Sequence, residues 1–383
     1  RLAFSLAVSS FLSLASSQAL ANPTDGVVTG GSAAISSSGS TLTVNQSSSR
    51  AIIQWGKFDI ASGETTQFIQ PGKGSIALNR VVNSDQISAI NGNLTANGRV
   101  LVINPNGVLI GPSGHVDVAG FVASTADTDD AAFMSGANVL QFNHAGKLNG
   151  AVENQGTITI NDAGLGLLVA PTVRNNGVIQ GNLARLQMGA GDVFGVDFYG
   201  DGLLNLALSD STTARTVKAE NAGSIIANAG KVVMTAAAAN NVVNSVINTT
   251  GVIEAKGLVS KGGEIILTGA GAHVQVAGTV DASGKTGGGS VKIGGDYQGG
   301  GALAKADEVT VDDTARVSAN ADTKGDGGLI VVWSEKLTKA FGDFFAKGGK
   351  KGGNGGVIET SSKGVLSVDG AIANTLASNG KVG

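Results

Sequence analysis

The stretch Gly263-Glu-Ile-Ile-Leu267, a glycine followed by a short apolar run, recurs along the C-terminal half of this chain. Its copies begin at Gly230, Gly289, Gly328 and Gly356, so the spacings are 33, 26, 39 and 28 residues. Repetition at about 20–40 residues indicates units that stack on one another. Runs of four to six apolar residues between glycines are typical of short strands.

A second series places asparagine shortly before glycine and a strand-like run. Its members begin at Asn154, Asn175, Asn221 and Asn248. Because Asn and Gly tolerate positive φ, we expect both residues to turn the chain at sharp corners between strands. Aromatic residues are only 4% of the chain, which suits a narrow interior filled by Val, Ile, Leu and Ala.

These patterns predict an all-β protein, a right-handed parallel β-helix or β-solenoid, with loops and hairpins of variable length outside its coils. At about 22 residues per coil, residues 22–383 would form roughly 16 coils. A β-sandwich is the alternative, but it would show turn signals about every 8–12 residues. Weak alternation between Val27 and Val44 predicts a capping sheet that covers the open edge of the first coil.

The N-terminal segment is predicted to be a secretory signal peptide. An apolar run from Leu2 to Leu14 is followed by Ala19-Leu-Ala21, which predicts residues 1–21 as the signal and cleavage between Ala21 and Asn22. The chain begins at Arg1 and stops within the repeat pattern, so we expect the natural protein to extend past both ends. No later run reaches the roughly 18 apolar residues of a membrane span.

Composition narrows the classes of function. The formal net charge of −3 offers no overall basic field for nucleic acid or an anionic membrane, and no such partner is expected. The absence of Cys excludes disulfides, Cys-ligated zinc and thiol catalysis. His115, His144 and His273 have no metal-ligand spacing, so no metal site, cofactor or enzymatic activity is predicted.

Residues 51–125 carry a series of motifs in a fixed order. They are Ala51-Ile-Ile-Gln-Trp55-Gly-Lys-Phe58-Asp-Ile60, Thr66-Gln-Phe68-Ile-Gln70, Leu78-Asn79-Arg80-Val81, Gln86-Ile-Ser88, Asn91-Gly-Asn93-Leu94-Thr-Ala-Asn97-Gly98, Asn104-Pro105-Asn106-Gly107-Val-Leu-Ile110 and Phe121-Val-Ala-Ser-Thr125. Together they resemble the secretion domain of two-partner secretion exoproteins, the haemagglutination-activity domain. The resemblance is to the branch of high-molecular-weight adhesins and haem–haemopexin utilisation proteins. In the filamentous haemagglutinin branch the first asparagine motif is Asn-Pro-Asn-Leu, and here Gly92 replaces that proline.

The resemblance implies a role for two sets of residues. The transporter-recognition or secretion motif would be Asn91, Asn93, Leu94, Asn104, Pro105, Asn106 and Gly107. The structural motif would be Trp55, Phe58, Phe68, Asn79 and Arg80. Residues 22–270 would form the secretion domain and residues 271–383 the beginning of a Gly-rich repeat shaft.

The resemblance also implies a route and a partner. The chain would pass through the periplasm of a Gram-negative bacterium and cross the outer membrane as an extended polymer. The partner would be an outer-membrane transporter with periplasmic domains and a β-barrel. The product would be secreted or held at the cell surface.

The function of the whole protein is left open between three classes. The first is an adhesin or surface fibre, the second a protein that captures a host haem carrier, and the third the stalk of a contact-dependent toxin. The host or neighbouring-cell receptor is not specified by the sequence.

Two long interruptions of the repeat, residues 127–147 and 190–218, are candidate sites for loops outside the coils. The second contains Phe194, Phe198 and Tyr199, which form a possible binding loop if exposed. The alternative is that these rings fill a wider coil or cap a bend. Asp127, Asp129 and Asp130 in the first interruption, and the basic run Lys347–Lys351, are interpreted as solvated loop residues.

Overall fold

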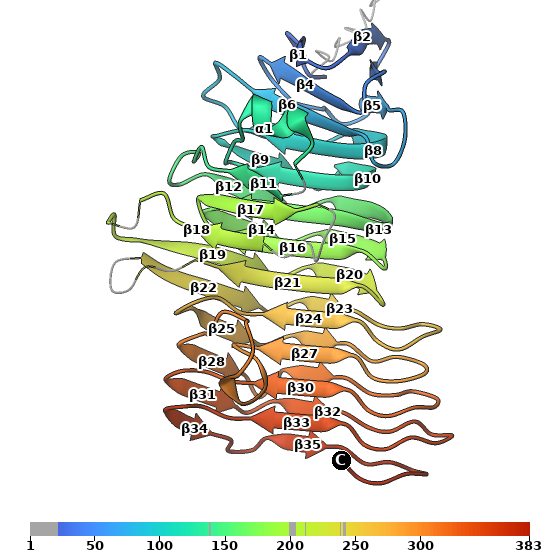
Figure 1. The fold of residues 1–383 in the computed structure, drawn as a ribbon, viewed down its shortest axis with the longest axis vertical. Coiled ribbons are helices and arrows are strands. Elements are labelled where there is room, and N and C mark those ends of the chain that lie inside the picture. The colour runs from blue at the N-terminus through green and yellow to red at the C-terminus, as the bar shows by residue number, and fades with distance from the viewer. Residues whose placement is uncertain (1–21, 138, 199–203, 211, 238, 240–242) are drawn as a thin grey trace, which may run out of the picture.

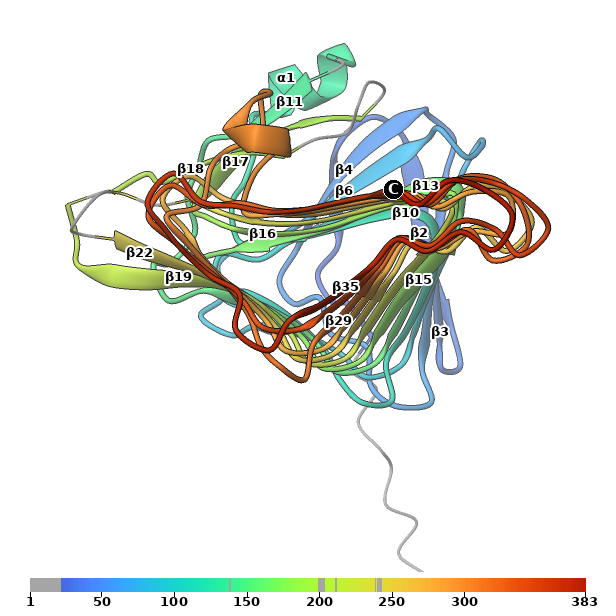
Figure 2. The same cartoon turned by 90° about the horizontal axis from the view of Figure 1, so that it is seen from below.

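The computed structural model describes residues 22–383 except 138, 199–203, 211, 238 and 240–242. The described chain winds into a stack of parallel strands that extends from an N-terminal cap, at the top of Figure 1, to the C-terminal coils at the bottom. Seen along the stack, the coils superimpose as a triangle whose sides are three faces (Figure 2). The predicted parallel β-helix is therefore confirmed.

Most coils contribute one strand to each of three faces, and strands within a face pair in parallel. Face A consists of β7 (Ser88–Ile90), β9 (Gly107–Ile110), β12 (Ala151–Asn154), β14 (Thr172–Asn175), β19 (Arg215–Asn221), β22 (Val243–Thr249), β25 (His273–Val276), β28 (Glu308–Val311), β31 (Leu337–Ala340) and β34 (Val365–Ser367). Face B consists of β3 (Thr41–Gln46), β5 (Thr65–Ile69), the first parts of β8 (Asn93–Ile103), β10 (His115–Ser124) and β13 (Thr157–Ala170), then β15 (Val178–Asn182), β20 (Ser224–Asn228), β23 (Val252–Glu254), β26 (Thr279–Asp281), β29 (Arg316–Ser318), β32 (Asp343–Phe345) and β35 (Ile372–Asn374). Face C consists of β4 (Arg50–Trp55), β6 (Ile76–Val81), the second parts of β8, β10 and β13, then β16 (Arg185–Ala190), β21 (Lys231–Ala236), β24 (Glu264–Leu267), β27 (Ser290–Ile293), β30 (Leu329–Val332) and β33 (Val357–Thr360).

The number of coils is lower than the sequence estimate. Within the described residues, faces A, B and C have ten, twelve and eleven strands, whereas roughly 16 coils were predicted. The shorter coils do have about the expected length, since Ala151 pairs in register with Thr172. Later coils are longer because loops project from the corners, so that Leu337 pairs with Val365, 28 residues further on.

The expected capping sheet is present at the N-terminal end. Strand β1 (Val27–Gly30) pairs antiparallel with β4, and β2 (Ala33–Ser38) pairs antiparallel with β3. These antiparallel pairings end the parallel stack and cover the first coil (Figure 1). Strands β1 and β2 lie in the segment between Val27 and Val44 where the capping sheet was expected.

The asparagines of the second series have a different role from the predicted one. Asn154, Asn175 and Asn221 are buried inside the coils at the ends of face A strands, and none of them has positive φ. Their side chains form a column: Asn154 Nδ2 donates to Asn175 Oδ1 and Asn175 Nδ2 to Asn221 Oδ1, both at 2.8 Å. Thr249 ends the column by accepting from Asn221 Nδ2 at 3.2 Å. The buried side-chain amides of successive coils therefore serve as hydrogen-bond partners for one another.

The repeated glycines also form columns, at two corners of the triangle, and close backbone approach explains them. A Cβ atom at Gly328 would lie 2.0 Å from the carbonyl oxygen of Gly289, and one at Gly289 would lie 2.1 Å from that of Gly263. The same approach joins Gly223 to Gly177 at the corner between faces A and B. The glycines of neither column have positive φ. The prediction that glycine is needed there because it tolerates positive φ at a corner is therefore wrong at these positions.

Face C of the N-terminal coils is covered by elements outside the helix. These are α1 (Asp130–Ser135) and a three-stranded antiparallel sheet of β11 (Val139–Phe142), β17 (Val193–Asp197) and β18 (Leu204–Ala207). A short 3-10 turn, η1 (Tyr297–Gly299), projects from the same side further along the rod (Figure 2). The covering sheet, meaning β11, β17 and β18, brings together the two interruptions that the sequence singled out.

A second hydrophobic core lies between the covering sheet and face C. Outward-facing residues of β6 to β13, such as Leu78, Leu101 and Leu167, are buried there. The covering elements contribute Phe133, Leu140, Phe142, Phe194, Val196 and Phe198. Outward positions on a solenoid face are normally polar, so these apolar residues indicate coils that need a cover. Among the described residues, no helix has the length and apolar composition of a membrane span.

Candidate functional site

The turn Asn104-Pro105-Asn106-Gly107 joins face C to face A, between β8 and β9. Asn104 is buried, and its Nδ2 donates to the Gln86 carbonyl at 3.0 Å and to Ser88 Oγ at 3.1 Å. Its Oδ1 accepts from the backbone N–H of Asn106 at 3.0 Å. The turn residues are thus hydrogen-bonded to the preceding coil.

Asn106 and Gly107 are fixed by separate constraints. Asn106 Nδ2 donates to the Ser84 carbonyl at 2.9 Å, which holds the loop of residues 82–87 against the turn. Gly107 has φ +135°, and a Cβ there would lie 2.6 Å from the Ala151 carbonyl oxygen of the next coil. Any L side chain at position 107 is therefore strained by both its backbone and its neighbour.

Asn91, Asn93 and Leu94 lie at the corner between faces A and B, just after β7. Leu94 is fully buried in the interior, whereas the Asn93 side chain is exposed and contacts Thr65 Oγ1 only at 3.4 Å. The Asn91 backbone N–H donates to the Ile60 carbonyl at 2.7 Å, and its carbonyl accepts from Ser113 Oγ at 2.7 Å. The two asparagine motifs therefore occupy different corners, and Asn104 links them through β7.

Four of the five predicted structural residues are buried in the main core. Trp55 and Phe58 make an edge-to-face contact with ring centroids 5.8 Å apart, and Phe68 is buried nearby on face B. Asn79 accepts from Trp55 Nε1 at 3.0 Å and donates to the Leu101 carbonyl at 3.2 Å. This single amide connects three successive coils, which explains why a polar residue stands inside the solenoid.

Arg80, the fifth residue, clamps the covering elements to face C. Its Nη1 lies 2.8 Å from Asp130 Oδ1, and its Nε lies 2.5 Å from Asp127 Oδ2. Burial alone would lower the pKa of the guanidinium, but hydrogen bonds and charge attraction from both aspartates raise that pKa above its ordinary value. The sequence placed these residues 47 and 50 positions apart, and no local signal could have paired them.

The remaining acidic residue of this loop also has a partner within the protein. His144 Nε2 lies 2.8 Å from Asp129 Oδ1, and the hydrogen bond lowers the pKa of the Asp129 carboxyl. Backbone hydrogen bonds in both directions between Asp127 and His144 close the base of the loop of residues 127–144. Asp129 and Asp130 are exposed, as expected of solvated loop residues, whereas Asp127 is partly buried, and each of the three also pairs with a basic side chain. No three His, Asp or Glu side chains in the described part of the chain are placed to hold a metal ion.

The proposed aromatic binding loop is also corrected. Phe194 and Phe198 are only 3% and 4% exposed, since they belong to the second core. Phe194 stacks on Phe142 with a centroid separation of 4.2 Å. Two of the three rings therefore hold the covering sheet to face C and offer no surface, while Tyr199 lies outside the described residues.

Of the predicted cleavage site, Ala21 and the signal peptide before it lie outside the described residues. Asn22, the first residue expected in the mature chain, donates from its Nδ2 to the Ser40 carbonyl at 3.0 Å and accepts from Thr66 Oγ1 at 3.0 Å. The new N-terminus would therefore be tied to the cap and to face B.

The capped β-helix, with its covering sheet and two asparagine corners, defines the export domain of a secreted β-helical exoprotein. Residues 18–282 match the model of the TPS secretion domain, where TPS denotes two-partner secretion, and the chain belongs to this family. The structure is similar to the crystal structure of the HMW1 secretion domain from Haemophilus influenzae. The TM-score is 0.74 and the identity 26%, over 94% of this chain and 100% of that one.

Two curated relatives are heme/hemopexin-binding proteins of Haemophilus influenzae. The protein of strain Rd is 32% identical over 207 residues, which are 52% of this chain and 22% of the relative. The second is 42% identical over 88 residues, 23% of this chain and 9% of the relative. The matched part is thus a small fraction of those proteins. The chain contains the domain that directs a two-partner secretion exoprotein across the outer membrane.

Proposed function

We propose that the periplasmic domains of a partner β-barrel transporter bind residues 22–125 while this segment is still extended. The burial of the motif supports this order of events. In the folded chain Leu94 and Asn104 are buried and Asn106 is engaged with the Ser84 carbonyl. A receptor that contacts these side chains must therefore meet them before the coils close. An extended segment can add to a receptor sheet by main-chain pairing, with side-chain pockets that give specificity.

Folding would then follow export, outside the outer membrane. Each strand of the β-helix pairs with the strand of the preceding coil, so a finished coil offers a template for the next. The cap formed by β1 to β4 supplies the first such template. The absence of Cys supports passage as an unbranched chain, since no disulfide could close it in the periplasm.

We further propose that residues 22–270 act as the secretion unit and residues 271–383 as the first coils of a shaft. The covering sheet ends at Ala207, and the later coils are stacked with their corner loops on one side (Figure 1). The whole protein would be a surface adhesin of the filamentous haemagglutinin type that acts by binding, without enzymatic activity. The relatives named as heme/hemopexin-binding favour capture of a haem carrier as the second candidate. A toxin stalk is the third.

Secretion of matched turn variants tests the recognition proposal. With the partner transporter co-expressed, Asn106→Val/Gly107→Val should lower the amount of secreted protein. The control is Lys351→Val/Gly352→Val, because Gly352 has the same φ of +135° and open space around it, but lies outside the proposed segment. Equal secretion of both variants would contradict a role for the turn in export.

A binding measurement separates recognition from folding. Purified periplasmic domains are mixed with the chain of residues 22–383, either rapidly diluted from urea or fully refolded. We expect capture of the freshly diluted chain and little capture of the refolded one. Equal binding of the folded protein would show that the transporter recognises the finished β-helix.

A further inference from the structure

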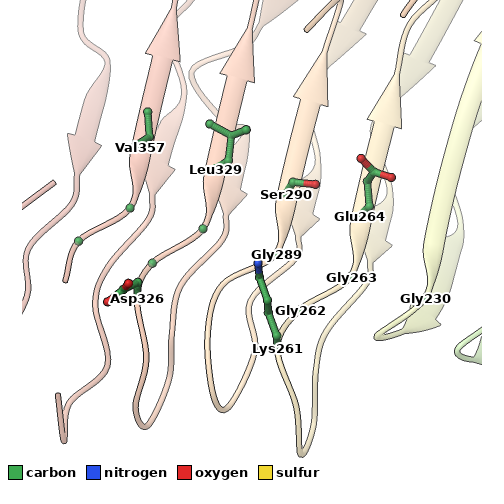
Figure 3. Close-up of a pocket in the computed structure, with 14 residues that line it drawn as sticks. Gly230, Lys261, Gly262, Gly263, Glu264, Gly289, Ser290, Asp326, Leu329 and Val357 are labelled. Atoms are coloured by element: carbon green, nitrogen blue, oxygen red, sulfur yellow. The ribbon is translucent and has the colours of Figure 1, made fainter. Parts of the chain in front are cut away.

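The outward side of face C carries a continuous apolar strip in the N-terminal coils. The strip is formed by β4, β6, β8, β10 and β13, which contribute Ile52, Ile76, Leu78, Leu101, Ile103, Val122, Leu165, Leu167 and Val169. At one end of these strands, Leu165 is followed in register by Arg185, Lys231, Glu264 and Ser290. Figure 3 shows Glu264 and Ser290 on neighbouring strands of this more polar part. The continuous strip therefore coincides with the coils that the covering elements hide.

The covering sheet depends on those coils for its own stability, because its apolar side is buried against the strip. An isolated hairpin such as β17 with β18 is marginal in water, so it needs both β11 and the strip beneath it. Its pairing with β11 is also distant in sequence, since Phe142 pairs with Phe194. In the first coils the separation is less than half as large, as between Ile76 and Arg99. Because distant contacts form late, we expect the coils to stack first and the sheet to dock afterwards.

Three arginines at the rim of the strip each hold a different part of the cover. Arg50 of β4 donates from Nη1 to the Phe133 carbonyl in α1 at 2.9 Å, and its guanidinium lies 5.4 Å from the centroid of that ring. Arg80 of β6 pairs with one aspartate before α1 and with the aspartate that begins α1. The guanidinium of Arg99 in β8 lies 6.0 Å from the centroid of the Phe198 ring, directly after β17. All three arginines precede these partners in the chain, so the stacked coils present them before the cover arrives.

A buried ion pair closes the base of the segment that contains β17 and β18. Asp192 lies just before β17 and Arg215 begins β19, and their side chains are 2% and 10% exposed. Arg215 Nη1 donates to Asp192 Oδ1 at 2.7 Å, and the Ser209 N–H donates to Asp192 Oδ2 at 3.1 Å. Removal of one partner from such a pair is strongly destabilising, because it leaves a buried charge without a counterion. The pair forms only when the two ends of the segment are brought together, so it stabilises the closed arrangement.

We propose that the covering elements α1, β11, β17 and β18 form a strap that closes over face C in a second folding step, and that the Asp192–Arg215 pair is its latch. In the open state the first coils are stacked, but the apolar strip is exposed to water. In the closed state the strip is buried and the coils beneath it are held together. Closure requires the chain up to Arg215, so the coils that form earlier in export stay reversible until that residue has crossed the outer membrane.

A strap differs in two measurable ways from a wall that forms together with the coils. An open state is populated during folding, and its exposed strip binds a hydrophobic dye. In the native protein the strap opens separately, so that its own amides exchange with solvent while the coils stay protected. Neither property involves the transporter, so the strap can be upheld where the proposed recognition of the extended chain fails, and the reverse.

Refolding of residues 22–383 from urea, followed by pulsed hydrogen exchange and by the fluorescence of the dye ANS, tests the first property. We expect the amides of β8 and β10 to become protected about tenfold faster than those of β11 and β17. The ANS fluorescence should rise as β8 and β10 become protected and fall as β11 and β17 do. Simultaneous protection of all four strands, or earlier protection of β11 and β17, would overturn the proposal.

Native-state hydrogen exchange of a latch variant tests the second property. Asp192→Asn/Arg215→Gln replaces both charges by neutral amides, and Arg174→Gln/Glu220→Gln is the control, since it removes a more exposed ion pair from face A. In the latch variant we expect about tenfold faster exchange in β11 and β17, with β9 and β12 unchanged, and no change in the control. Equal exchange in the two variants, or equal acceleration of all strands, would contradict the latch. If circular dichroism shows that the latch variant does not fold, the refolding of the parent chain decides.

Discussion

Replacement of Asn175 by alanine tests whether the amide column stabilises the stack. The Asn175 side chain donates to Asn221 Oδ1 at 2.8 Å and to the Ser224 carbonyl at 3.2 Å, and it accepts from Asn154 Nδ2 at 2.8 Å. Three hydrogen bonds at about 1 kcal/mol each, with a further penalty for buried groups left unpaired, amount to about 4 kcal/mol. The coils that contain β14 and β19 should therefore open far more often.

Native-state hydrogen exchange measures this opening directly. The amide of Ala222 donates to the Asn175 carbonyl, and the amide of Gly177 donates to the Asn154 carbonyl, so both report on the column. A loss of about 4 kcal/mol predicts exchange that is 10²–10³-fold faster at these amides, since about 1.4 kcal/mol is a factor of ten.

The neighbouring residue provides a matched control. Asn176 is exposed, and its side chain makes one hydrogen bond of 3.2 Å to Glu153, so Asn176→Ala should change the exchange by less than a factor of about three. Asn175→Thr should recover part of the protection, because Thr249 already accepts from Asn221 at the end of the column. If Asn175→Ala and Asn176→Ala accelerate exchange equally, the column contributes nothing to stability.

Three further predictions concern the other contacts. Gly328→Ala should destabilise the chain by about 3 kcal/mol in urea unfolding, because its Cβ would meet a carbonyl oxygen at 2.0 Å. Gly72→Ala, whose Cβ would lie in open space, should leave the unfolding midpoint unchanged, and equal midpoints for the two variants would refute this reasoning. Phe194→Ala should cost about 3–5 kcal/mol and loosen the covering sheet, as limited proteolysis would detect; unchanged resistance would argue against the second core. Burial and then repulsion by Asp281 raise the pKa of Asp322, so its ionised form opposes folding, and this penalty falls as the pH drops through the raised value. Asp322→Asn should raise the melting temperature at pH 7, with a gain that shrinks below about pH 4; a pH-independent difference would be inconsistent with this cause.

The parallel stack was predictable because its determinants are local. The runs after Gly230, Gly263 and Gly289 are strands β21, β24 and β27 of one face, in register with one another. Strand length, glycine spacing and the lack of aromatics are all properties of the chain itself. The capping segment was likewise visible as a change in pattern before Val44.

The contacts between distant coils could not be predicted in the same way. Asn154, Asn175 and Asn221 are indistinguishable from turn residues until the stack places them above one another. Arg80 forms an ion pair with Asp127 because the segment that contains α1 and β11 folds back across face C. Phe194 was a candidate for an exposed ring because the sequence does not reveal that β11 and β17 pair. Exposure is a property of the assembled fold, whereas strand periodicity belongs to the segment.

The covering sheet gives the rod unequal mechanical strength along its length. Strands β11 and β17 cross the outer side of several N-terminal coils and share one hydrophobic core with them, so those coils must separate together under tension. Beyond Ala207 the described coils keep the strand pairing and the interior core, but they have no covering sheet that ties several coils together from outside. A pull on the C-terminal end would therefore peel coils one at a time until it reached the covered part, which would yield only at a higher force.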